Sequence, residues 1–226
     1  MTDTAIFDID GTLIDSNYQH AIAWFRAFRR FDVTCPLWEI HRAVGMGGEF
    51  LVPEVGGKAL EREHGDEVRD AQIEEFDQLI DEVQPFEGAH ELLREVRDRG
   101  FSLVLASSGK AKHVEQFLDL LDARDLADAW TTSDDADRSK PEPDIVASAM
   151  NKAAGTTGVM IGDSTWDIIA AGKLGIPSIA VRSGGYGVDE LRQAGALRVF
   201  DSLVDLGTHL DDTPFRTPTS EPIAYG

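Results

Sequence analysis

The sequence contains little cysteine and little positive charge, and it has no long hydrophobic run. Cys35 is the only cysteine among the 226 residues, so an intramolecular disulfide bond is excluded and an oxidising compartment is not indicated. Lysine and arginine number 21 against 41 acidic residues, which gives a formal net charge of −20. Because nucleic acids and anionic membranes bind basic surfaces, neither is an expected partner.

Targeting signals are missing as well. Residues 1–8, MTDTAIFD, carry no basic region and no long apolar stretch, so a signal peptide is not expected. No apolar run approaches the length that spans a membrane. We therefore expect a soluble, cytoplasmic protein, either a monomer or a homodimer. Since 42% of the residues are hydrophobic, the chain can bury a sizeable core, and its length suits one domain with an insertion.

Short apolar runs alternate with helical patterns along most of the chain. The runs are nearly continuous in hydrophobicity, which is typical of strands buried on both faces of a parallel sheet. Their alternation with helices predicts an α/β fold with a doubly wound parallel sheet. The expected strands are Ala5–Phe7, Ser102–Ala106, Ala129–Thr132, Val159–Ile161, Ser178–Val181 and Arg198–Phe200, and the expected helices lie near 89–99, 110–121, 142–153, 165–174, 187–194 and 202–209.

The alternation is interrupted once, after Asp15, by about seventy residues without a convincing strand. The interruption begins with a possible capping box at residues 16–19, SNYQ, which would open a helix. A second helix is expected over 37–44, followed by the glycine-rich stretch GMGGEFLVPEVGG and an acidic, helix-prone stretch to Val83. The apolar face of the first helix would consist of Ala21, Trp24, Phe25 and Phe28.

These patterns divide the chain into three parts. We predict a core formed by residues 1–15 and 86–210 and a helical insertion formed by residues 16–85. The last part, residues 211–226, reads DDTPFRTPTSEPIAYG. Because this segment is polar and contains proline, we expect a weakly ordered tail.

Two carboxylates end the first apolar run. The sequence AIFDIDGT places Asp8 and Asp10 at the end of the first expected strand, directly before Gly11. Residues i and i+2 of an extended chain point to the same side, so both carboxylates can face the crevice beyond the carboxyl edge of the sheet. They repel each other unless a cation such as Mg²⁺, which prefers oxygen ligands, shares the site. Taken alone, the pattern is also that of an ordinary turn.

Two other loops carry groups that attract an anion. Ser107, Ser108 and Gly109 follow the strand SLVLA, where hydroxyls and free backbone N–H groups can hold an anion, although Ser107 can equally cap a helix. Lys140 precedes Pro141 at an expected helix start. A single lysine is usually a surface residue, but an ammonium group near a helix N-terminus attracts a phosphate.

A further loop adds two carboxylates. Asp163 follows the apolar run VMIG, and Asp167 falls in the first turn of the next expected helix, where a capping role is the alternative. The carboxyl ends of parallel strands meet at one edge of a sheet, so these residues would come together with Asp8. Three carboxylates would form a Mg²⁺ site, and Ser107 and Lys140 would face the anion held there.

With these motifs in place, the chain resembles the haloacid dehalogenase superfamily. The resemblance is to the phosphatase-type branch with a helical cap after the first strand, which includes phosphoglycolate phosphatase and β-phosphoglucomutase. The stretches FDIDGTLIDS, LVLASSGK, SKPEPD and IGDSTWDIIAAGKLGIPSIAV occur in the family's order and cover roughly residues 1–20 and 86–205. Four ordered motifs are a specific signal, whereas the cap matches mainly in its position, its helicity and the region of His20.

The resemblance implies a Mg²⁺-dependent phosphatase. Asp8 would be the nucleophile that forms an aspartyl-phosphate, and Asp10 would protonate the leaving group and then activate the hydrolytic water. Asp8, the backbone carbonyl of Asp10 and Asp163 would hold Mg²⁺. Asp167 would be either a further metal ligand or a residue that orients Lys140 or a metal-bound water.

The resemblance also implies how the phosphate group is held. Ser107 and Lys140 would contact its oxygens, and Gly11, Ser108 and Gly109 would complete the phosphate-binding surface. The expected partner is a small phosphorylated metabolite such as phosphoglycolate or a sugar phosphate.

Two residues of the cap are candidate substrate-binding residues. His20 lies on the first cap helix, where a packed or partly exposed histidine is the common case, and the resemblance favours a position facing the active site. Arg42 lies beside the glycines of residues 45–48. It would meet a substrate carboxylate or a second phosphate, unless it is an ordinary surface arginine.

Asp10 separates the branches of the superfamily. The dehalogenases lack an acidic residue at this position because a departing halide needs no proton, so Asp10 favours phosphoryl transfer. A phosphonatase would need a Schiff-base lysine in the cap, where Lys58 is the only lysine and lies in a Gly-Gly-Lys turn. A sugar-phosphate mutase shares all four motifs and stays open as an alternative. A non-catalytic phospho-ligand binder on the same fold stays open as well.

Overall fold

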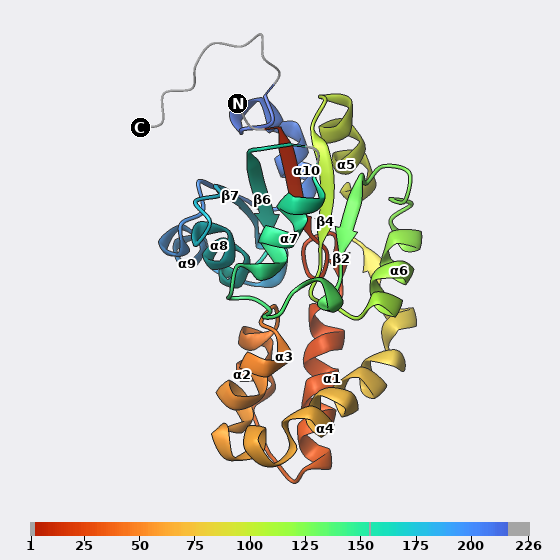
Figure 1. The fold of residues 1–226 in the computed structure, drawn as a ribbon, viewed down its shortest axis with the longest axis vertical. Coiled ribbons are helices and arrows are strands. Elements are labelled where there is room, and N and C mark those ends of the chain that lie inside the picture. The colour runs from red at the N-terminus through yellow and green to blue at the C-terminus, as the bar shows by residue number, and fades with distance from the viewer. Residues whose placement is uncertain (1–2, 154, 217–226) are drawn as a thin grey trace.

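The computed structural model describes residues 3–153 and 155–216 (Figure 1). In this part of the chain six parallel strands form one sheet, in the order β5-β4-β1-β6-β7-β8. The predicted α/β class with a parallel sheet is confirmed, and each predicted strand is present within two residues of its expected bounds. The strands are β1 (Thr4–Asp8), β4 (Ser102–Ala106), β5 (Ala129–Thr131), β6 (Gly158–Gly162), β7 (Ser178–Val181) and β8 (Arg198–Phe200).

Helices cover both faces of the sheet because alternate strand residues point to opposite sides. Ala5 and Phe7 of β1 belong to a hydrophobic cluster with α5, α6 and α10, whereas Ile6 belongs to a separate cluster with α7 and α8. This two-sided burial explains the continuous apolar runs in the sequence. The helices are α5 (Ala89–Asp98), α6 (Ala111–Leu120), α7 (Asp144–Lys152), α8 (Thr165–Gly172), α9 (Val188–Ala194) and α10 (Leu203–Thr208).

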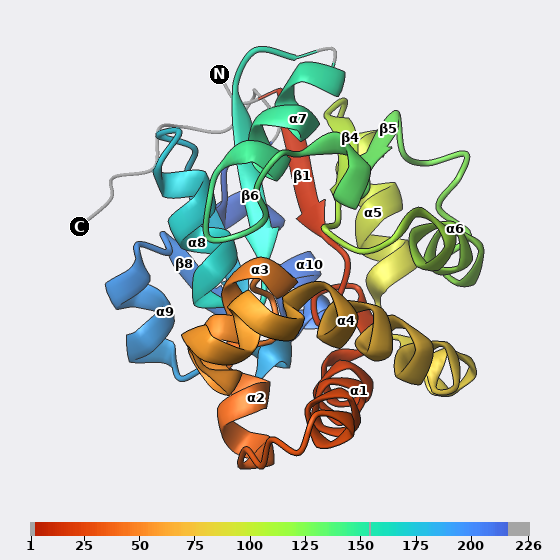
Figure 2. The ribbon, with the colours of Figure 1, turned by 60° about the horizontal axis from the view of Figure 1, so that its bottom comes forward.

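The helical insertion stands at the carboxyl end of the sheet (Figures 1 and 2). We call residues 16–85 the cap. Its helices share a hydrophobic cluster that contains Trp24, Phe28, Ile40 and Val68 and no residue of the core. The helical segments of the cap are α1 (Asn17–Arg30), α2 (Leu37–Ala43), α3 (Gly48–Leu51), a π-helical turn (Val52–Gly56), α4 (Lys58–Asp77) and a 3₁₀ turn (Ile80–Glu82).

The two junctions between the cap and the core pair with each other. Strand β2 (Ile14–Asp15) is antiparallel to β3 (Gln84–Pro85). This two-residue ladder was not predicted, because strands so short leave no alternating pattern in a sequence. The prediction of a capping box at Ser16 was wrong. Ser16 makes no side-chain cap hydrogen bond and instead donates its hydroxyl to Asp10 Oδ1 at 2.9 Å.

The C-terminal segment differs from the expected weakly ordered tail as far as the structure describes it. Phe215 is fully buried, and its ring stacks on Phe7 of the central strand with 6.3 Å between ring centroids. Arg99 fastens the same segment, with Nη1 donating to Asp211 Oδ1 at 2.6 Å and to the backbone oxygen of Phe215 at 3.2 Å. The polar composition of the segment gave no indication that Phe215 would pack against the core. Residues 217–226 of the predicted tail lie outside the described residues.

No helix in the described ranges combines the length and the apolar character needed to cross a lipid bilayer.

The burial of Phe215 predicts that the C-terminal segment supports the core. Replacement of Phe215 by alanine removes a buried ring that contacts β1, so the free energy of unfolding should fall by about 3–5 kcal/mol. Denaturant unfolding measures this change. In the control Leu197→Ala, which truncates a side chain that is 49% exposed, the change should stay within about 0.5 kcal/mol. Similar small changes in both variants would contradict the anchoring role.

Candidate active site

The turn after β1 brings its carboxylates against the end of β6. Asp8 is the last residue of β1, and β6 is its hydrogen-bonded neighbour, so Asp163 directly after β6 lies beside it. Gly11 turns the chain with a φ of +78°. A Cβ at this position would lie 2.5 Å from Asp163 Oδ2, so only glycine allows the approach. Gly11, predicted to bind substrate, therefore packs against Asp163 and is not among the residues that line the cavity described below.

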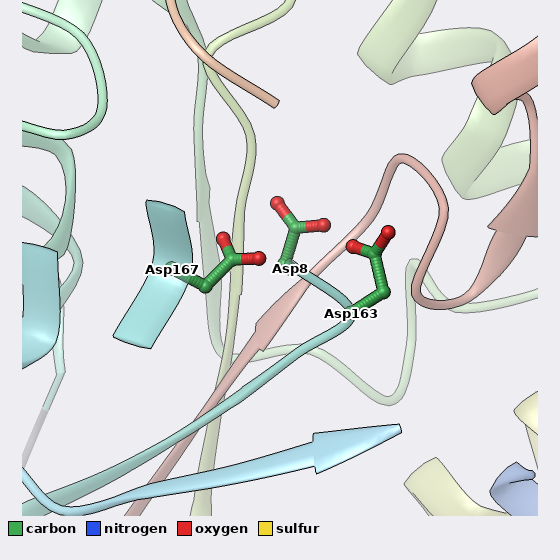
Figure 3. Close-up of side chains that lie close together, drawn as sticks. All are labelled: Asp8, Asp163 and Asp167. Atoms are coloured by element: carbon green, nitrogen blue, oxygen red, sulfur yellow. The ribbon is translucent and has the colours of Figure 1, made fainter. Parts of the chain in front are cut away.

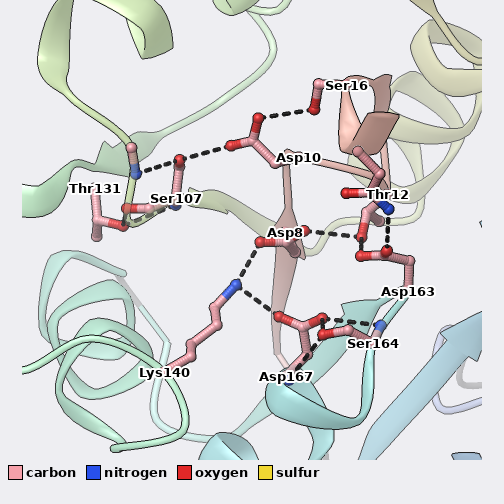
Figure 4. Close-up of polar contacts among 12 residues, drawn as sticks. Asp8, Asp10, Thr12, Ser16, Ser107, Thr131, Lys140, Asp163, Ser164 and Asp167 are labelled. Carbon is pink, nitrogen blue, oxygen red and sulfur yellow. Dashed lines mark hydrogen bonds and ion pairs between the residues drawn. The ribbon is translucent and has the colours of Figure 1, made fainter. Parts of the chain in front are cut away.

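A buried lysine lies between two of the carboxylates. Lys140 is 2% exposed, and its Nζ forms ion pairs with Asp8 Oδ1 and, at 2.6 Å, with Asp167 Oδ1. Burial alone would lower the pKa of Lys140, but the carboxylates of Asp167 and Asp8 hold it well above its ordinary value. The lysine is thus charged, and it offsets part of the negative charge around it (Figure 4).

Three aspartates fit a hard divalent cation. Carboxylate oxygens of Asp8, Asp163 and Asp167 lie within 4.8 Å of one another, and all three residues are buried (Figure 3). Burial and the nearby Asp167 raise the pKa of Asp163 to about 7, and burial raises that of Asp8 well above its ordinary value. Three buried carboxylates with one lysine leave excess negative charge. An all-oxygen set with this charge is suited to Mg²⁺.

The ligand set is held in place by its neighbours. Thr12 Oγ1 lies 3.0 Å from both Asp8 Oδ2 and Asp163 Oδ1, and Asn17 Nδ2 donates to Asp163 Oδ2 at 2.9 Å. Asp167 Oδ2 accepts hydrogen bonds from Ser164 N at 3.2 Å and Ser164 Oγ at 2.7 Å, and the pair forms a capping box at the start of α8. Asp167 therefore caps a helix with one oxygen and contacts Lys140 with the other.

Asp10 has a different environment from Asp8. Its carboxylate accepts hydrogen bonds from Ser16 Oγ at 2.9 Å and Ser107 Oγ at 3.2 Å, and lies 2.9 Å from His20 Nε2. Burial would raise the pKa of Asp10, but the hydrogen bonds from His20 and Ser16 hold it below its ordinary value. Asp10 is thus an ionised carboxylate that can take up a proton. Asp8 differs because its carboxylate contacts Lys140.

Ser107, directly after β4, is held by hydrogen bonds of its backbone N–H and its hydroxyl. Its N–H donates to Thr131 Oγ1 at 3.2 Å, and its Oγ accepts from Gly109 N at 2.9 Å while it donates to Asp10. The residue that caps α6 is Lys110. The alternative role of Ser107 as a helix cap is therefore not the one observed.

A cavity of about 440 Å³ lies between the cap and the core, and residues of both parts line it. Asp10 and the loop residues Ser108 and Gly109 form part of the core side. His20, which stacks on Phe76 with 3.9 Å between ring centroids, forms part of the cap side. The predicted residues Asp10, His20, Ser108 and Gly109 are thus brought together at one cavity.

Arg42 lies elsewhere. Its Nη2 is 2.5 Å from Glu190 Oε1 of α9, and its guanidinium lies 4.1 Å from the centroid of the Tyr186 ring. These contacts engage the predicted substrate-binding arginine, which is not among the residues that line the cavity. Asp8, Ser107 and Lys140 are not among the lining residues either, but they contact one another or Asp10. The sequence pattern located Arg42 beside the glycine-rich loop but could not reveal that Glu190 of α9 and Tyr186, before that helix, supply a carboxylate and an aromatic ring for it.

Several residues of the site were missed. Thr12 and Asn17 support Asp163, and Trp24 and Gln72 line the cavity from the cap. The position of Thr12 right after the two aspartates was an available signal. Trp24 was assigned to the apolar face of its helix, and it does belong to the cap's hydrophobic cluster, so periodicity alone could not reveal its second contact.

Similarity to known proteins identifies the family. The model of the haloacid dehalogenase-like hydrolases matches residues 5–181. The chain belongs to this family. The predicted family and hydrolase class are therefore confirmed.

Individual members of the hydrolase family are similar over most of the chain. The validoxylamine A 7′-phosphate phosphatase of Streptomyces hygroscopicus subsp. limoneus is 28% identical over 78% of this chain and 84% of its own length. The phosphoglycolate phosphatase of Caulobacter vibrioides is 28% identical over 90% of this chain and 88% of its own. A crystal structure of a hydrolase from Pseudomonas syringae matches with a TM-score of 0.85 and 32% identity, covering 94% of this chain and 99% of that one.

Because the site of this hydrolase carries excess negative charge, removal of one carboxylate should stabilise the metal-free protein and weaken cation binding. Replacement of Asp163 by asparagine keeps the side-chain shape and removes one charge, so the metal-free variant should be more stable than the wild type by about 1–3 kcal/mol. Mg²⁺ should raise the melting temperature of the wild type and leave that of the variant unchanged.

Thermal melting with Mg²⁺ and with chelator measures both effects. In the control Asp125→Asn, which neutralises an exposed carboxylate, the response to Mg²⁺ should match that of the wild type. Equal stabilisation of wild type and Asp163→Asn by Mg²⁺ would argue against a cation site at Asp163.

Proposed function

We propose that this hydrolase is a Mg²⁺-dependent phosphatase of small phosphorylated metabolites that acts through an aspartyl-phosphate on Asp8. The observation that carries the proposal is the difference in surroundings between the two aspartates after β1. Asp8 lies against a charged lysine and two further carboxylates, whereas Asp10 lines the cavity beside Ser107 and His20. A nucleophile paired with a separate proton carrier suits ester hydrolysis, since binding alone would need neither.

In the first step, an oxygen of Asp8 attacks the phosphorus atom and the bond from phosphorus to the ester oxygen breaks. Asp10 donates its proton to the departing oxygen, which leaves as an alcohol. Asp10 is ionised in the free protein because its pKa is held low. The negative charge of a bound phosphate group beside it favours its protonated form, which the first step requires.

In the second step, Asp10 takes a proton from a water molecule whose oxygen attacks the phosphorus. The bond between phosphorus and Asp8 breaks, which restores the carboxylate and releases inorganic phosphate. Asp10 then holds the proton taken from water and loses it to solvent once the phosphate has left, because its pKa is low in the free protein. His20 and Ser16 keep the Asp10 carboxylate oriented toward the cavity through both steps.

Asp8, Asp163 and Asp167 would hold Mg²⁺, with the backbone carbonyl of Asp10 as a further ligand. When bound, this cation reduces the repulsion between an anionic nucleophile and an anionic phosphate and stabilises the transferring group. Lys140, which contacts Asp8 and Asp167, contributes a second positive charge. Ser107, with the loop residues Ser108 and Gly109, would hold the remaining phosphate oxygens.

The names of two similar proteins support a phosphomonoester substrate. Both are phosphatases of small molecules, one acting on a validoxylamine phosphate and the other on phosphoglycolate. The cavity of about 440 Å³ has room for a leaving group of metabolite size.

A sugar-phosphate mutase is the alternative, and the charges around the cavity favour hydrolysis over it. A mutase must hold a second phosphate at the far side of the substrate. Two cationic side chains, Arg69 and Lys110, line the cavity in the described part of the chain. Arg69 is already paired with Glu61 and Asp66, each at 2.8 Å, so its charge is largely neutralised.

Asp8→Asn should lower kcat by at least about 10⁴-fold, because an amide oxygen is a poor nucleophile toward a phosphate ester. The measurement is phosphate release from a panel of phosphorylated metabolites, with Mg²⁺ and with chelator. The chelator should abolish release by the wild type. Asp125→Asn should retain wild-type rates. Phosphate release by Asp8→Asn would exclude Asp8 as the nucleophile. Transfer of phosphate within a sugar phosphate, without release, would favour the mutase.

Asp10→Asn should affect substrates according to their leaving group. With an alkyl phosphate, kcat should fall by about 10²- to 10⁴-fold because the alkoxide leaves without a proton. With p-nitrophenyl phosphate, whose leaving group needs no proton, the first step should persist and the second should stall. Rapid mixing should then show a burst of p-nitrophenolate stoichiometric with the enzyme. A uniform loss for both substrates without a burst would contradict the proton-carrier role.

A further inference from the structure

The segment that opens α3 of the cap docks on the loop that carries Lys140. Gly47 N donates to the backbone oxygen of Lys140 at 2.9 Å, and Ser139 N donates to Glu49 Oε1 at 2.7 Å. Beside these two bonds, the guanidinium of Arg138 lies 5.1 Å from the centroid of the Phe50 ring. Three consecutive residues of the loop that carries Lys140, residues 138–140, thus contact the cap.

The close approach requires the residue types present. A Cβ on Gly47 would lie 2.1 Å from Ser139 Cβ, so any larger residue would push the two segments apart. Glu49 is in the first turn of α3 and spans the remaining gap with its carboxylate. A hydrogen bond from a backbone N–H to a carboxylate is charge-assisted and stronger than one between neutral groups.

The cap therefore holds the backbone on both sides of the Lys140 α-carbon. The bond to Ser139 N precedes that carbon in the chain, and the bond to the Lys140 carbonyl follows it. The loop before α7 has no regular secondary structure of its own between residues 136 and 143. One turn bond, from Glu142 N to the Ser139 oxygen at 2.9 Å, lies within it, and the contacts from the cap add to this bond at the lysine.

We propose that Glu49 is a positioning residue that couples the cap to Lys140. Through Ser139, it holds the lysine loop where Nζ reaches Asp8 and Asp167, so the charge arrangement around the nucleophile is completed only when the cap is in place. Glu49 also lines the cavity, and its carboxylate is already engaged by the loop. This inference rests on the proposed phosphatase function.

The test separates a positioning role from direct contact with substrate. Glu49→Ala removes the acceptor for Ser139 N, and kcat should fall by about 10- to 100-fold, the equivalent of one charge-assisted hydrogen bond. Because the effect acts through Lys140, the loss should be the same for p-nitrophenyl phosphate and for larger metabolite phosphates. Glu49→Gln keeps an acceptor oxygen and should recover most of the lost rate.

A matched control is Glu54→Ala, which truncates an exposed glutamate of the same cap segment and should retain wild-type kinetics. Binding of inorganic phosphate in the presence of Mg²⁺, measured by calorimetry, gives a readout without turnover. Glu49→Ala should weaken it in the wild-type background and should have no further effect in Lys140→Met, because the two residues act as one unit.

The inference would be overturned if Glu49→Ala raised only KM, and only for substrates with large leaving groups. It would also be overturned if Glu49→Gln failed to recover activity, or if Glu49→Ala weakened phosphate binding equally with and without Lys140. A wild-type protein that neither binds phosphate nor releases it would instead overturn the proposed function. A wild type that is active, with Glu49→Ala indistinguishable from Glu54→Ala, would overturn this inference alone.

Discussion

The ion pairs of the buried Lys140 with Asp8 and Asp167 are the constraint on which the rest of the site depends. Burying several carboxylates together is costly unless opposite charges share their site. Lys140 supplies one such charge, and its pKa stays high because two carboxylates contact it. The remaining negative charge is evident in the raised pKa values of Asp8 and Asp163. The cation binding and the reactivity that we propose for this site would thus have one electrostatic origin.

The sheet and the cap contribute to this arrangement in different ways. The core brings Asp8 and Asp163 together because β1 and β6 are adjacent parallel strands, and both residues are buried. The cap has its own hydrophobic cluster, and its two junctions with the core pair as a short ladder. It adds His20 beside Asp10 and the contacts to the lysine loop. Under the proposed function, a substrate between cap and core would contact groups that neither part would present alone.

Much of the core could be predicted because its signals are local. Strands buried on both faces need continuous apolar runs, and the polar residues directly after them must fall at the carboxyl edge. Asp8, Ser107 and Asp163 were located by this argument alone. The argument failed where a contact lies outside the local pattern. Ser16 has the residue type of a helix cap but bonds to Asp10, and Phe215 belongs to a largely polar segment but stacks on Phe7.

The sequence by itself determined the order of strands and helices, the residue types at the strand ends and the family to which the chain belongs, because each depends on patterns within a few neighbouring residues. The tertiary structure decided which of those residues meet. It turned Arg42 away from the cavity toward Glu190, gave Asp167 both a helix cap and a lysine contact, and joined Glu49 to the loop of Lys140. The contacts of Arg42 and Glu49 join the cap to the core, so they exist only once the chain has folded with the cap against the core.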